Sequence, residues 1–304
     1  GGAKADIYRR LLRLRDQYAE QIRARYPSVE KMPRRVSGYN LDELLPEKGF
    51  SVARALVGTE GTCATALVVT LMLTPALLER STVIVEYADI ADAAEHVEEI
   101  IDRWRPIGLE AIDDVLVHNE IDRHIDADTV NRLPRRGGTH SWLLVELGAD
   151  TKEEAADRAR RFRDWLVAAK GYATDRIAVH ESRRDGGDAD KIWKVREGGL
   201  GVTAFPPDGT DHWPGWEDSA VPPPRIGDYV RDLKKLYAKF DVRGAMYGHF
   251  GQDCVHSRIS FDLRTAQGIR ASRKFLEDAA DLVVSYGGSL SGEHGDGQQR
   301  AELL

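Results

Sequence analysis

The stretch "RGAMYGHFGQDCVHSRISFD", residues 243–262, predicts the β-hairpin around which the fold is organised. Two runs that alternate between apolar and polar residues flank a short polar loop, which is the pattern of an antiparallel strand pair. Pairing Phe250 with Val255 across a four-residue loop places His249 directly opposite His256. Their Cβ atoms would then lie about 4.5–5.5 Å apart on one face of the sheet. The hairpin therefore predicts two imidazoles within reach of one ligand.

The alternation along the hairpin also assigns its other side chains to the two faces. Successive side chains of a strand point to opposite faces of a sheet. By this rule Tyr247 and Arg258 share the face of the histidines, whereas Val255, Ser257 and Ile259 point the other way. Arg258 is therefore expected to face the same ligand as the two imidazoles.

A second stretch, "SGEHGDGQQR" (residues 291–300), places Glu293 and His294 between glycines. Two close imidazoles suit one transition metal, whose bonds to nitrogen are about 2.0–2.1 Å long. Glu293 is the natural third ligand, since a set of two histidines and one carboxylate leaves coordination positions open for substrate. The residues alone leave a simpler interpretation open. In it the histidines are partly exposed polar side chains, and Glu293 and His294 lie in a loop before a helix cap.

Around the hairpin, strand-like and helical patterns alternate along the chain. Strand patterns cover residues 82–89, 141–150 and 176–182, and helical patterns cover 4–25, 90–107, 152–171, 188–199, 228–240 and 266–288. The apolar run that ends at Pro75 is interpreted as a buried strand. These patterns predict an α+β fold with a mainly antiparallel sheet and helices packed on one face. We expect one domain over residues 79–304 and the end of another over residues 1–78.

Composition excludes several classes of protein. A formal net charge of −7 argues against a general nucleic-acid partner. The longest apolar run, residues 65–78, is too short to cross a bilayer, so we expect no membrane anchor in this chain. Cys63 and Cys254 provide neither a disulfide framework nor a cluster motif, which favours a reducing compartment. Three arginine pairs are interpreted as solvated surface charge: Arg34–Arg35, Arg135–Arg136 and Arg183–Arg184.

Five motifs in order carry a resemblance to a known family. They are "GTEGTCATALVVTL", "KIWKVREGG", "EDSAVPPPRIGDYV", "YGHFGQDCVH" and "GGSLSGEHGDGQQRAELL". Together they resemble the FAD-linked oxidases of the vanillyl-alcohol oxidase type, which include D-lactate, glycolate and D-2-hydroxyglutarate dehydrogenases. The resemblance spans about residues 36–304 and implies a ferredoxin-like C-terminal substrate domain preceded by the end of the FAD-binding domain. The first helix and "RRVSGYNLDELL" resemble long members fused to an iron–sulfur domain, which implies an internal piece of a longer enzyme.

The resemblance implies a role for each matching residue. His249, His256 and Glu293 match ligands of a divalent metal, which could be zinc, iron or manganese. His294 matches the base that removes the hydroxyl proton, and Arg196 matches the arginine that binds the substrate carboxylate. The residues that match the segment along the flavin are Gly58, Thr59, Glu60, Gly61 and Thr62.

The chain also departs from the family pattern. Many relatives carry an asparagine where this chain has Arg258. Because Arg258 is expected to face the site, we predict that it is a second anchor for an anion. A second anchor would favour a dicarboxylate or a larger 2-hydroxyacid.

The resemblance implies a flavin-dependent dehydrogenase that oxidises a D-2-hydroxyacid to the 2-oxoacid by hydride transfer to FAD. Electrons would pass to an iron–sulfur module outside this chain or to a quinone. The family implies a cytoplasmic location or one at the inner face of a membrane. Two alternatives remain open: a metal-dependent hydrolase with His294 as the base for a bound water, and a non-catalytic binding module with structural histidines.

Overall fold

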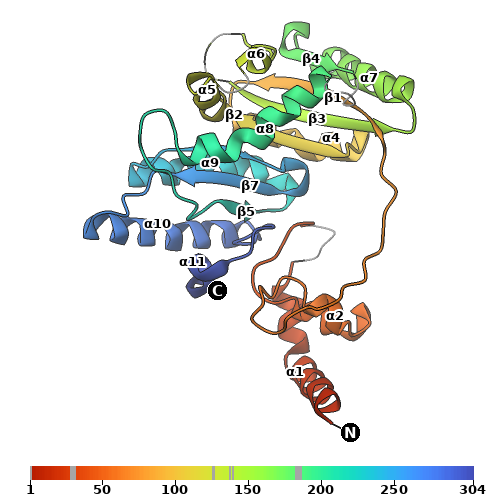
Figure 1. The fold of residues 1–304 in the computed structure, drawn as a ribbon, viewed down its shortest axis with the longest axis vertical. Helices are drawn as coiled ribbons and strands as arrows, with labels where there is room; N and C mark the ends of the chain where they lie inside the picture. The colour runs from red at the N-terminus through yellow and green to blue at the C-terminus, as the bar shows by residue number, and fades with distance from the viewer. Residues whose placement is uncertain (1, 28–31, 125–126, 137, 139, 182–186) are drawn as a thin grey trace.

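A seven-stranded sheet organises the computed structural model, which describes residues 2–27, 32–124, 127–136, 138, 140–181 and 187–304. The strand order is β4-β1-β3-β2-β6-β7-β5, and all neighbouring strands run antiparallel (Figure 1). In chain order the strands are β1 (Glu79–Tyr87), β2 (Gly108–Asp113), β3 (Ser141–Ala149), β4 (Ile177–His180), β5 (Asp218–Ala220), β6 (Gly244–Gly248) and β7 (Cys254–Ile259).

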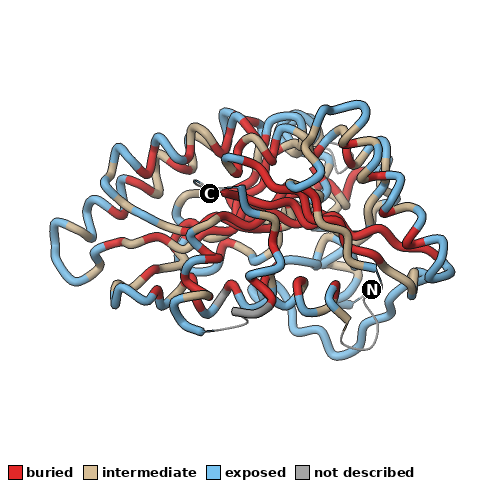
Figure 2. The backbone as a smooth tube through the Cα atoms, turned by 90° about the horizontal axis from the view of Figure 1, so that it is seen from above, coloured by how far each residue is buried: buried red, intermediate tan, exposed pale blue. Residues whose placement is uncertain are grey.

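Helices cover both faces of this sheet. One face carries the larger core, to which five helices contribute: α3 (Ile90–Glu95), α4 (Val97–Trp104), α7 (Lys152–Lys170), α9 (Ile226–Phe240) and α10 (Ala266–Ser285). The opposite face carries a smaller core with three: α5 (Asp114–Asp122), α6 (Ala127–Val130) and α8 (Asp188–Ala204). Figure 2 shows the buried strands between the two helical layers.

The predicted α+β fold with an antiparallel sheet is confirmed, but helices cover two faces rather than one. The reason lies in the central strands. In β1, Val83 and Val85 enter the larger core while Ile84 enters the smaller one. A strand buried on both faces reads as a continuous apolar run and gives no sign of a solvent face.

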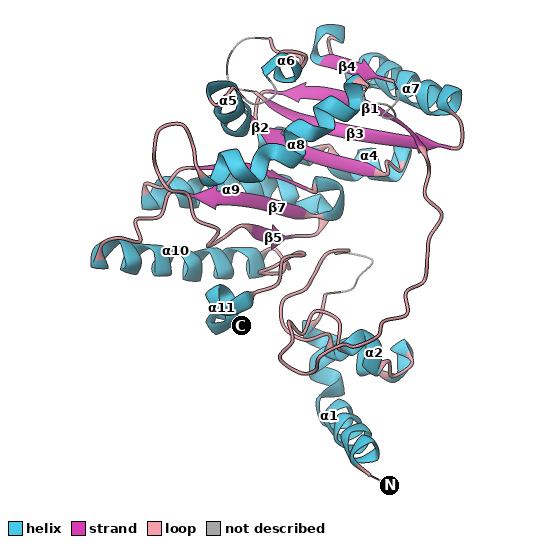
Figure 3. Cartoon of the chain, in the orientation of Figure 1, coloured by secondary structure: helices cyan, strands magenta, loops and turns pink. Residues whose placement is uncertain are grey.

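The N-terminal residues form a group of one long helix and three short elements below the sheet (Figure 3). These are α1 (Ala3–Arg25), η1 (Leu41–Leu44), η2 (Pro46–Lys48) and α2 (Val52–Ala55). The remaining short elements are η3 (Thr174–Arg176), η5 (Pro223–Arg225), η6 (Phe250–Gln252), α11 (Gly297–Arg300) and η7 (Ala301–Leu303). Among the described residues no helix combines the length and apolarity that a membrane span requires.

The prediction of a buried strand before Pro75 is wrong. Residues 68–78 have no regular secondary structure, and Leu67, Met72 and Leu73 are 89%, 94% and 90% exposed. Apolar composition favours a strand only where a neighbouring strand pairs with it, and no described strand does so. The run is therefore extended and open to solvent.

Most other predicted elements are present, and two strands escaped prediction. The helical pattern over residues 90–107 is divided at His96 into α3 and α4. Thr151 caps α7 as expected, because its Oγ1 accepts a hydrogen bond from the Glu154 backbone N–H at 3.2 Å. β2 carries polar residues and β5 has only three residues, so neither gives a clear pattern.

We expect a substitution in the sheet core to lower the free energy of unfolding far more than a substitution in the exposed run. Leu144→Ala, in β3, should lower the free energy of unfolding by about 2–5 kcal/mol because it leaves a cavity in a fully buried core. Leu73→Ser should change it by less than about 0.5 kcal/mol, since Leu73 has little to lose. Urea denaturation of the two variants measures both values. A large loss in Leu73→Ser would contradict the solvent-open position of the run.

Candidate active site

The hairpin of β6 and β7 forms as predicted, but in a different register. Tyr247 pairs with His256, so the loop is longer than four residues and contains η6. His249 lies beyond the paired region instead of opposite His256. Gly248 causes the difference: it has φ 147°, and a Cβ there would lie 2.5 Å from the carbonyl oxygen of Cys254. Only glycine lets the strand leave the ladder at this point.

The predicted assignment of side chains to the two faces of the sheet is correct despite this error in register. The shift equals two residues, and only an odd shift would exchange the faces of a strand. Tyr247 packs in the smaller core, on the face of α8, whereas Val255 and Ile259 pack in the larger core. The rings of His249 and His256 come together with centroids 5.2 Å apart.

The turn that carries Glu293 and His294 is tied to β5 by one carboxylate. Asp218 is fully buried, and its Oδ2 accepts hydrogen bonds from Ser291 Oγ at 2.7 Å and from the backbone N–H groups of Glu293 and His294 at 2.8 Å each. Position 292 has no room for a side chain, because a Cβ on Gly292 would lie 2.4 Å from the Sγ of Cys254. The turn is therefore held against β5 with both side chains aimed at His256.

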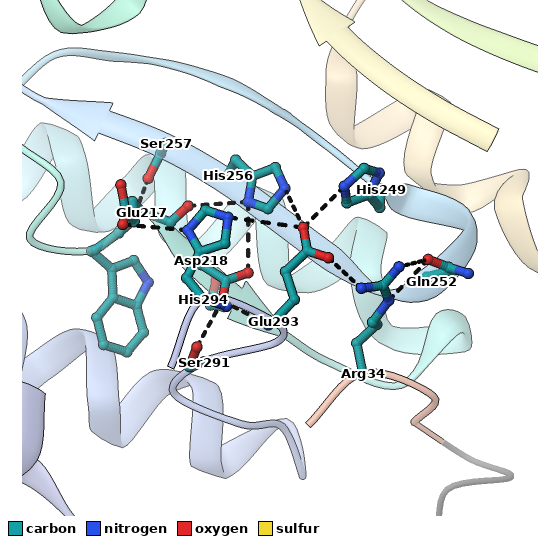
Figure 4. Close-up of polar contacts among 12 residues, drawn as sticks. Arg34, Glu217, Asp218, His249, Gln252, His256, Ser257, Ser291, Glu293 and His294 are labelled. Atoms are coloured by element: carbon teal, nitrogen blue, oxygen red, sulfur yellow. Dashed lines mark hydrogen bonds and ion pairs between the residues drawn. The ribbon is translucent and has the colours of Figure 1, made fainter. Parts of the chain in front are cut away.

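Glu293 is the point at which the histidines converge (Figure 4). Its Oε1 lies 2.9 Å from His249 Nε2 and 3.3 Å from His256 Nε2. One ligand atom from each of these three residues lies within 4.8 Å of the others. Two imidazole nitrogens and a carboxylate oxygen at such distances fit a divalent zinc, iron or manganese ion. His294 stacks on His256 with ring centroids 4.9 Å apart, and its Nε2 lies 3.8 Å from Glu293 Oε1.

A second possible ligand set, Asp218, His256 and His294, shares His256 with the first. Asp218 Oδ1 lies 3.6 Å from the Nδ1 of His256, whereas Glu293 Oε1 lies 2.9 Å and 3.3 Å from the Nε2 atoms of the two histidines in the first set. The set of His249, His256 and Glu293 is therefore better suited to hold a metal.

Acidic residues lie behind each of the three histidines. His249 Nδ1 is 2.6 Å from Glu110 Oε1, on β2. His294 Nδ1 is 3.3 Å from Glu217 Oε1. His256 Nδ1 has the backbone carbonyl oxygen of Glu217 as its hydrogen-bond partner at 3.3 Å, and Asp218 Oδ1 lies beyond hydrogen-bond distance at 3.6 Å. Acceptors in these positions fix the proton on Nδ1 and leave Nε2 free for a metal or a substrate proton.

The two predicted arginines lie at the site. Arg196, on α8, places Nε 2.6 Å from Glu110 Oε2 and Nη2 3.1 Å from His249 Nε2. Arg258, on β7, places Nη2 3.0 Å from Glu217 Oε2. The Nε of Arg258 is buried and has no hydrogen-bond partner among the described residues. An unsatisfied donor of this kind is available to an anionic ligand.

The interpretation of the first arginine pair as solvated charge is wrong. Arg34 forms an ion pair with Glu293, and Arg35 forms one with Asp42 in which both side chains are nearly buried. The local sequence gave no sign of either partner. Arg135 and Arg136 are exposed as expected, and Arg183–Arg184 lies outside the described residues.

The glycine turn at residues 58–62 lies directly against the Glu293–His294 turn. Gly58 and Gly61 have φ angles of 80° and 73°, which glycine adopts without strain. Glu60 accepts hydrogen bonds from the backbone N–H of Asp296 at 3.0 Å and of Gly297 at 3.1 Å. Glu60 thus links the segment predicted to contact flavin to backbone groups two and three residues after His294, the predicted base. The contact of this segment with flavin stays a prediction.

Electrostatics within the site favour a charged cluster. Burial lowers the pKa of His249, but hydrogen bonds to Glu110 and Glu293 raise it to about 9. Hydrogen bonds to His249 and His256 hold the pKa of Glu293 far below its usual range, with a further contribution from the charge of Arg34. The hydrogen bond to Glu217 raises the pKa of His294.

The structure brings together all six residues predicted as ligands or catalytic groups, and their roles stay predictions. They are Arg196, His249, His256, Arg258, Glu293 and His294. Sequence reasoning missed the residues that hold them, namely Arg34, Glu110, Glu217 and Asp218. Two of these stood in the quoted motif "EDSAVPPPR", where a role could have been sought.

Comparison with known proteins places this chain in a family. Residues 78–304 match the family described as FAD linked oxidases, C-terminal domain. The chain is 26% identical to a D-2-hydroxyglutarate dehydrogenase of Pseudomonas putida over 97% of this chain and 29% of that protein. It is 28% identical to a D-lactate dehydrogenase of Archaeoglobus fulgidus over 84% of this chain and 52% of that protein. The chain thus spans about 29% to 52% of the length of these two relatives.

Among solved structures, the chain is similar to a 4-ethylphenol oxidase from Gulosibacter chungangensis. The two share 11% sequence identity with a TM-score of 0.48, over 76% of this chain and 49% of that chain.

We expect the metal-free chain to lose stability as pH rises from about 6.5 to about 9. His249 has a folded pKa of about 9, above the value of about 6.5 for an unfolded histidine. The folded state therefore binds more protons in this window, so the contribution is complete below the unfolded pKa and disappears through the folded pKa. Urea denaturation in the presence of a chelator measures the slope.

His249→Gln should flatten that slope, whereas His118→Gln, at an exposed position, should retain it. A wild-type stability that stays constant across the window would contradict the charged pair at His249.

Proposed function

We propose, from the premise that this chain belongs to the FAD-linked oxidases through their C-terminal domain, that it is the substrate-binding part of a flavin-dependent dehydrogenase. The enzyme would oxidise a D-2-hydroxyacid to the 2-oxoacid. The observation that carries the proposal is the convergence of His249, His256 and Glu293, with His294 stacked beside them. The names of the D-2-hydroxyglutarate and D-lactate dehydrogenases support this substrate class.

The proposed mechanism assigns a task to each residue. A divalent metal held by His249, His256 and Glu293 would lower the pKa of the substrate hydroxyl. His294 would accept the hydroxyl proton at Nε2, since its Nδ1 is occupied by Glu217. Arg196 would bind the 2-carboxylate, because its planar guanidinium matches a carboxylate in two parallel hydrogen bonds.

FAD would accept the hydride from the substrate carbon. The glycine turn at residues 58–62 fits a place beside the flavin, since Glu60 ties it to the turn two residues beyond His294. A longer protein would supply the rest of the FAD-binding domain. An iron–sulfur module in that protein or a quinone would accept the electrons, in the cytoplasm or at the inner face of a membrane.

A metal-dependent hydrolase could use the same three ligands with a bound water and His294 as base. It gives no reason for the family match or for the contact between residues 58–62 and the site. A non-catalytic module with structural histidines would likewise give no reason for the family match.

The test of the proposed function is flavin reduction in a protein that joins this chain to a complete FAD-binding domain. D-2-hydroxyglutarate or D-lactate, mixed without oxygen, should bleach the flavin absorbance. His294→Ala should slow bleaching by about 10²–10⁴-fold, the usual contribution of a general base, while metal content stays unchanged. His118→Ala serves as the control. Hydrolysis of an ester without flavin dependence, and no bleaching, would favour the hydrolase.

Arg258→Ala should raise KM for D-2-hydroxyglutarate selectively. We propose that Arg258 binds the second carboxylate, and a lost charge-assisted hydrogen bond costs about 1.5–3 kcal/mol, or roughly 10–100-fold in KM. KM for D-lactate, which has no second carboxylate, should change little. Arg264→Ala is the matched control, because its side chain is 81% exposed. An equal rise in KM for both acids would exclude Arg258 as the second anchor.

A further inference from the structure

Arg34 reaches the site from a distant part of the chain. Its Nη1 donates to Glu293 Oε2, and its Nε donates to Gln252 Oε1 at 2.9 Å (Figure 4). A guanidinium holds its five N–H donors in a rigid plane, so two partners fix its orientation. The side chain is only 35% exposed, and that of Glu293 is 19% exposed. This ion pair is thus partly removed from water, unlike a solvated surface pair.

Hydrogen bonds hold the segment that carries Arg34 against the turn that carries Glu293. The backbone N–H of Val36 donates to the Ser291 carbonyl oxygen at 3.1 Å. Ser37 Oγ accepts from the Ser291 backbone N–H at 2.8 Å and donates to Asp296 Oδ1 at 3.0 Å. Bonds on both sides of Glu293 therefore set where the Arg34 guanidinium lies.

The two oxygens of Glu293 have separate partners. Oε1 faces the Nε2 atoms of His249 and His256, and Oε2 is bound by Arg34. A carboxylate with one oxygen engaged in this way offers the other oxygen to a metal. Hydrogen bonds to ligating carboxylates orient them and tune the metal.

We propose that Arg34 is a positioning residue for the metal, which holds Glu293 so that Oε1 alone faces the ligand position, and that Gln252 holds Arg34. The inference rests on the metal site of the proposed function.

The experiment measures Co²⁺ affinity of the chain by equilibrium dialysis, together with the visible absorption of bound Co²⁺. Arg34→Ala should weaken binding by about 10–100-fold, the usual effect of losing an outer-shell partner. Arg34→Lys should be intermediate, because an ammonium can pair with Glu293 but lacks the rigid planar donors that fix Arg34 between Glu293 and Gln252. The absorption band should shift in Arg34→Ala, since Glu293 is free to turn.

Three further variants separate the possible causes of weaker Co²⁺ binding in Arg34→Ala. Gln252→Ala should weaken Co²⁺ binding less than Arg34→Ala, and the double variant should be no weaker than Arg34→Ala. Arg23→Ala, which breaks the exposed pair with Glu47 in the same N-terminal region, should leave both readouts unchanged. His256→Ala should abolish binding.

The outcomes distinguish this inference from the proposed function. Wild-type binding that His256→Ala abolishes, with equal affinity and an equal spectrum in Arg34→Ala, would overturn the role of Arg34 and leave the metal site intact. Absence of Co²⁺ binding by the wild-type chain would overturn both.

Discussion

The buried carboxylate of Asp218 fixes the geometry on which the rest of the site depends. Asp218 pairs with His256 in the ladder of β5 and β7, and the same side chain accepts three hydrogen bonds from the turn of Glu293 and His294. Burial raises the pKa of Asp218, but the opposing effect of these hydrogen bonds is larger. The pKa therefore lies below its usual value, and the group stays charged at neutral pH. The position of the turn relative to His256 therefore follows from the pairing of one short strand.

A second buried charge secures the other side of the turn. Arg300, in α11, is 4% exposed and donates to the carbonyl oxygens of Asp218, Leu290 and Gly295. Asp218 and Arg300 thus satisfy several backbone groups of the turn, and Glu60 and Ser37 satisfy others. Because the turn lacks regular secondary structure, these side chains replace the hydrogen bonds that a helix or sheet would give it.

The sequence was sufficient for the residues that converge and insufficient for those that hold them. An error of two residues in the hairpin register left every face correct, because strand side chains repeat every two residues. Glu110 and Glu217 gave no such signal. β2, which carries Glu110, has no clear alternation, and Glu217 directly precedes β5, which is too short to show one, so no face could be assigned to either acid. Arg34 contacts Glu293, 259 positions away in the sequence, and the polar residues next to Arg34 in the sequence are typical of a solvent-exposed segment.

Charge balance explains why the site tolerates so many acids at close quarters. Its carboxylates are Glu110, Glu217, Asp218 and Glu293, and its guanidiniums are Arg34, Arg196 and Arg258. The raised pKa of His249 follows from two of these acids, since hydrogen bonds to Glu110 and Glu293 favour its proton. A divalent metal would need His249 Nε2 as a ligand and must displace that proton. The Nε2 proton and the metal are therefore alternative partners for the same cluster of acids. Glu110, which faces Nδ1, would keep the ring oriented after the Nε2 proton is released to solvent.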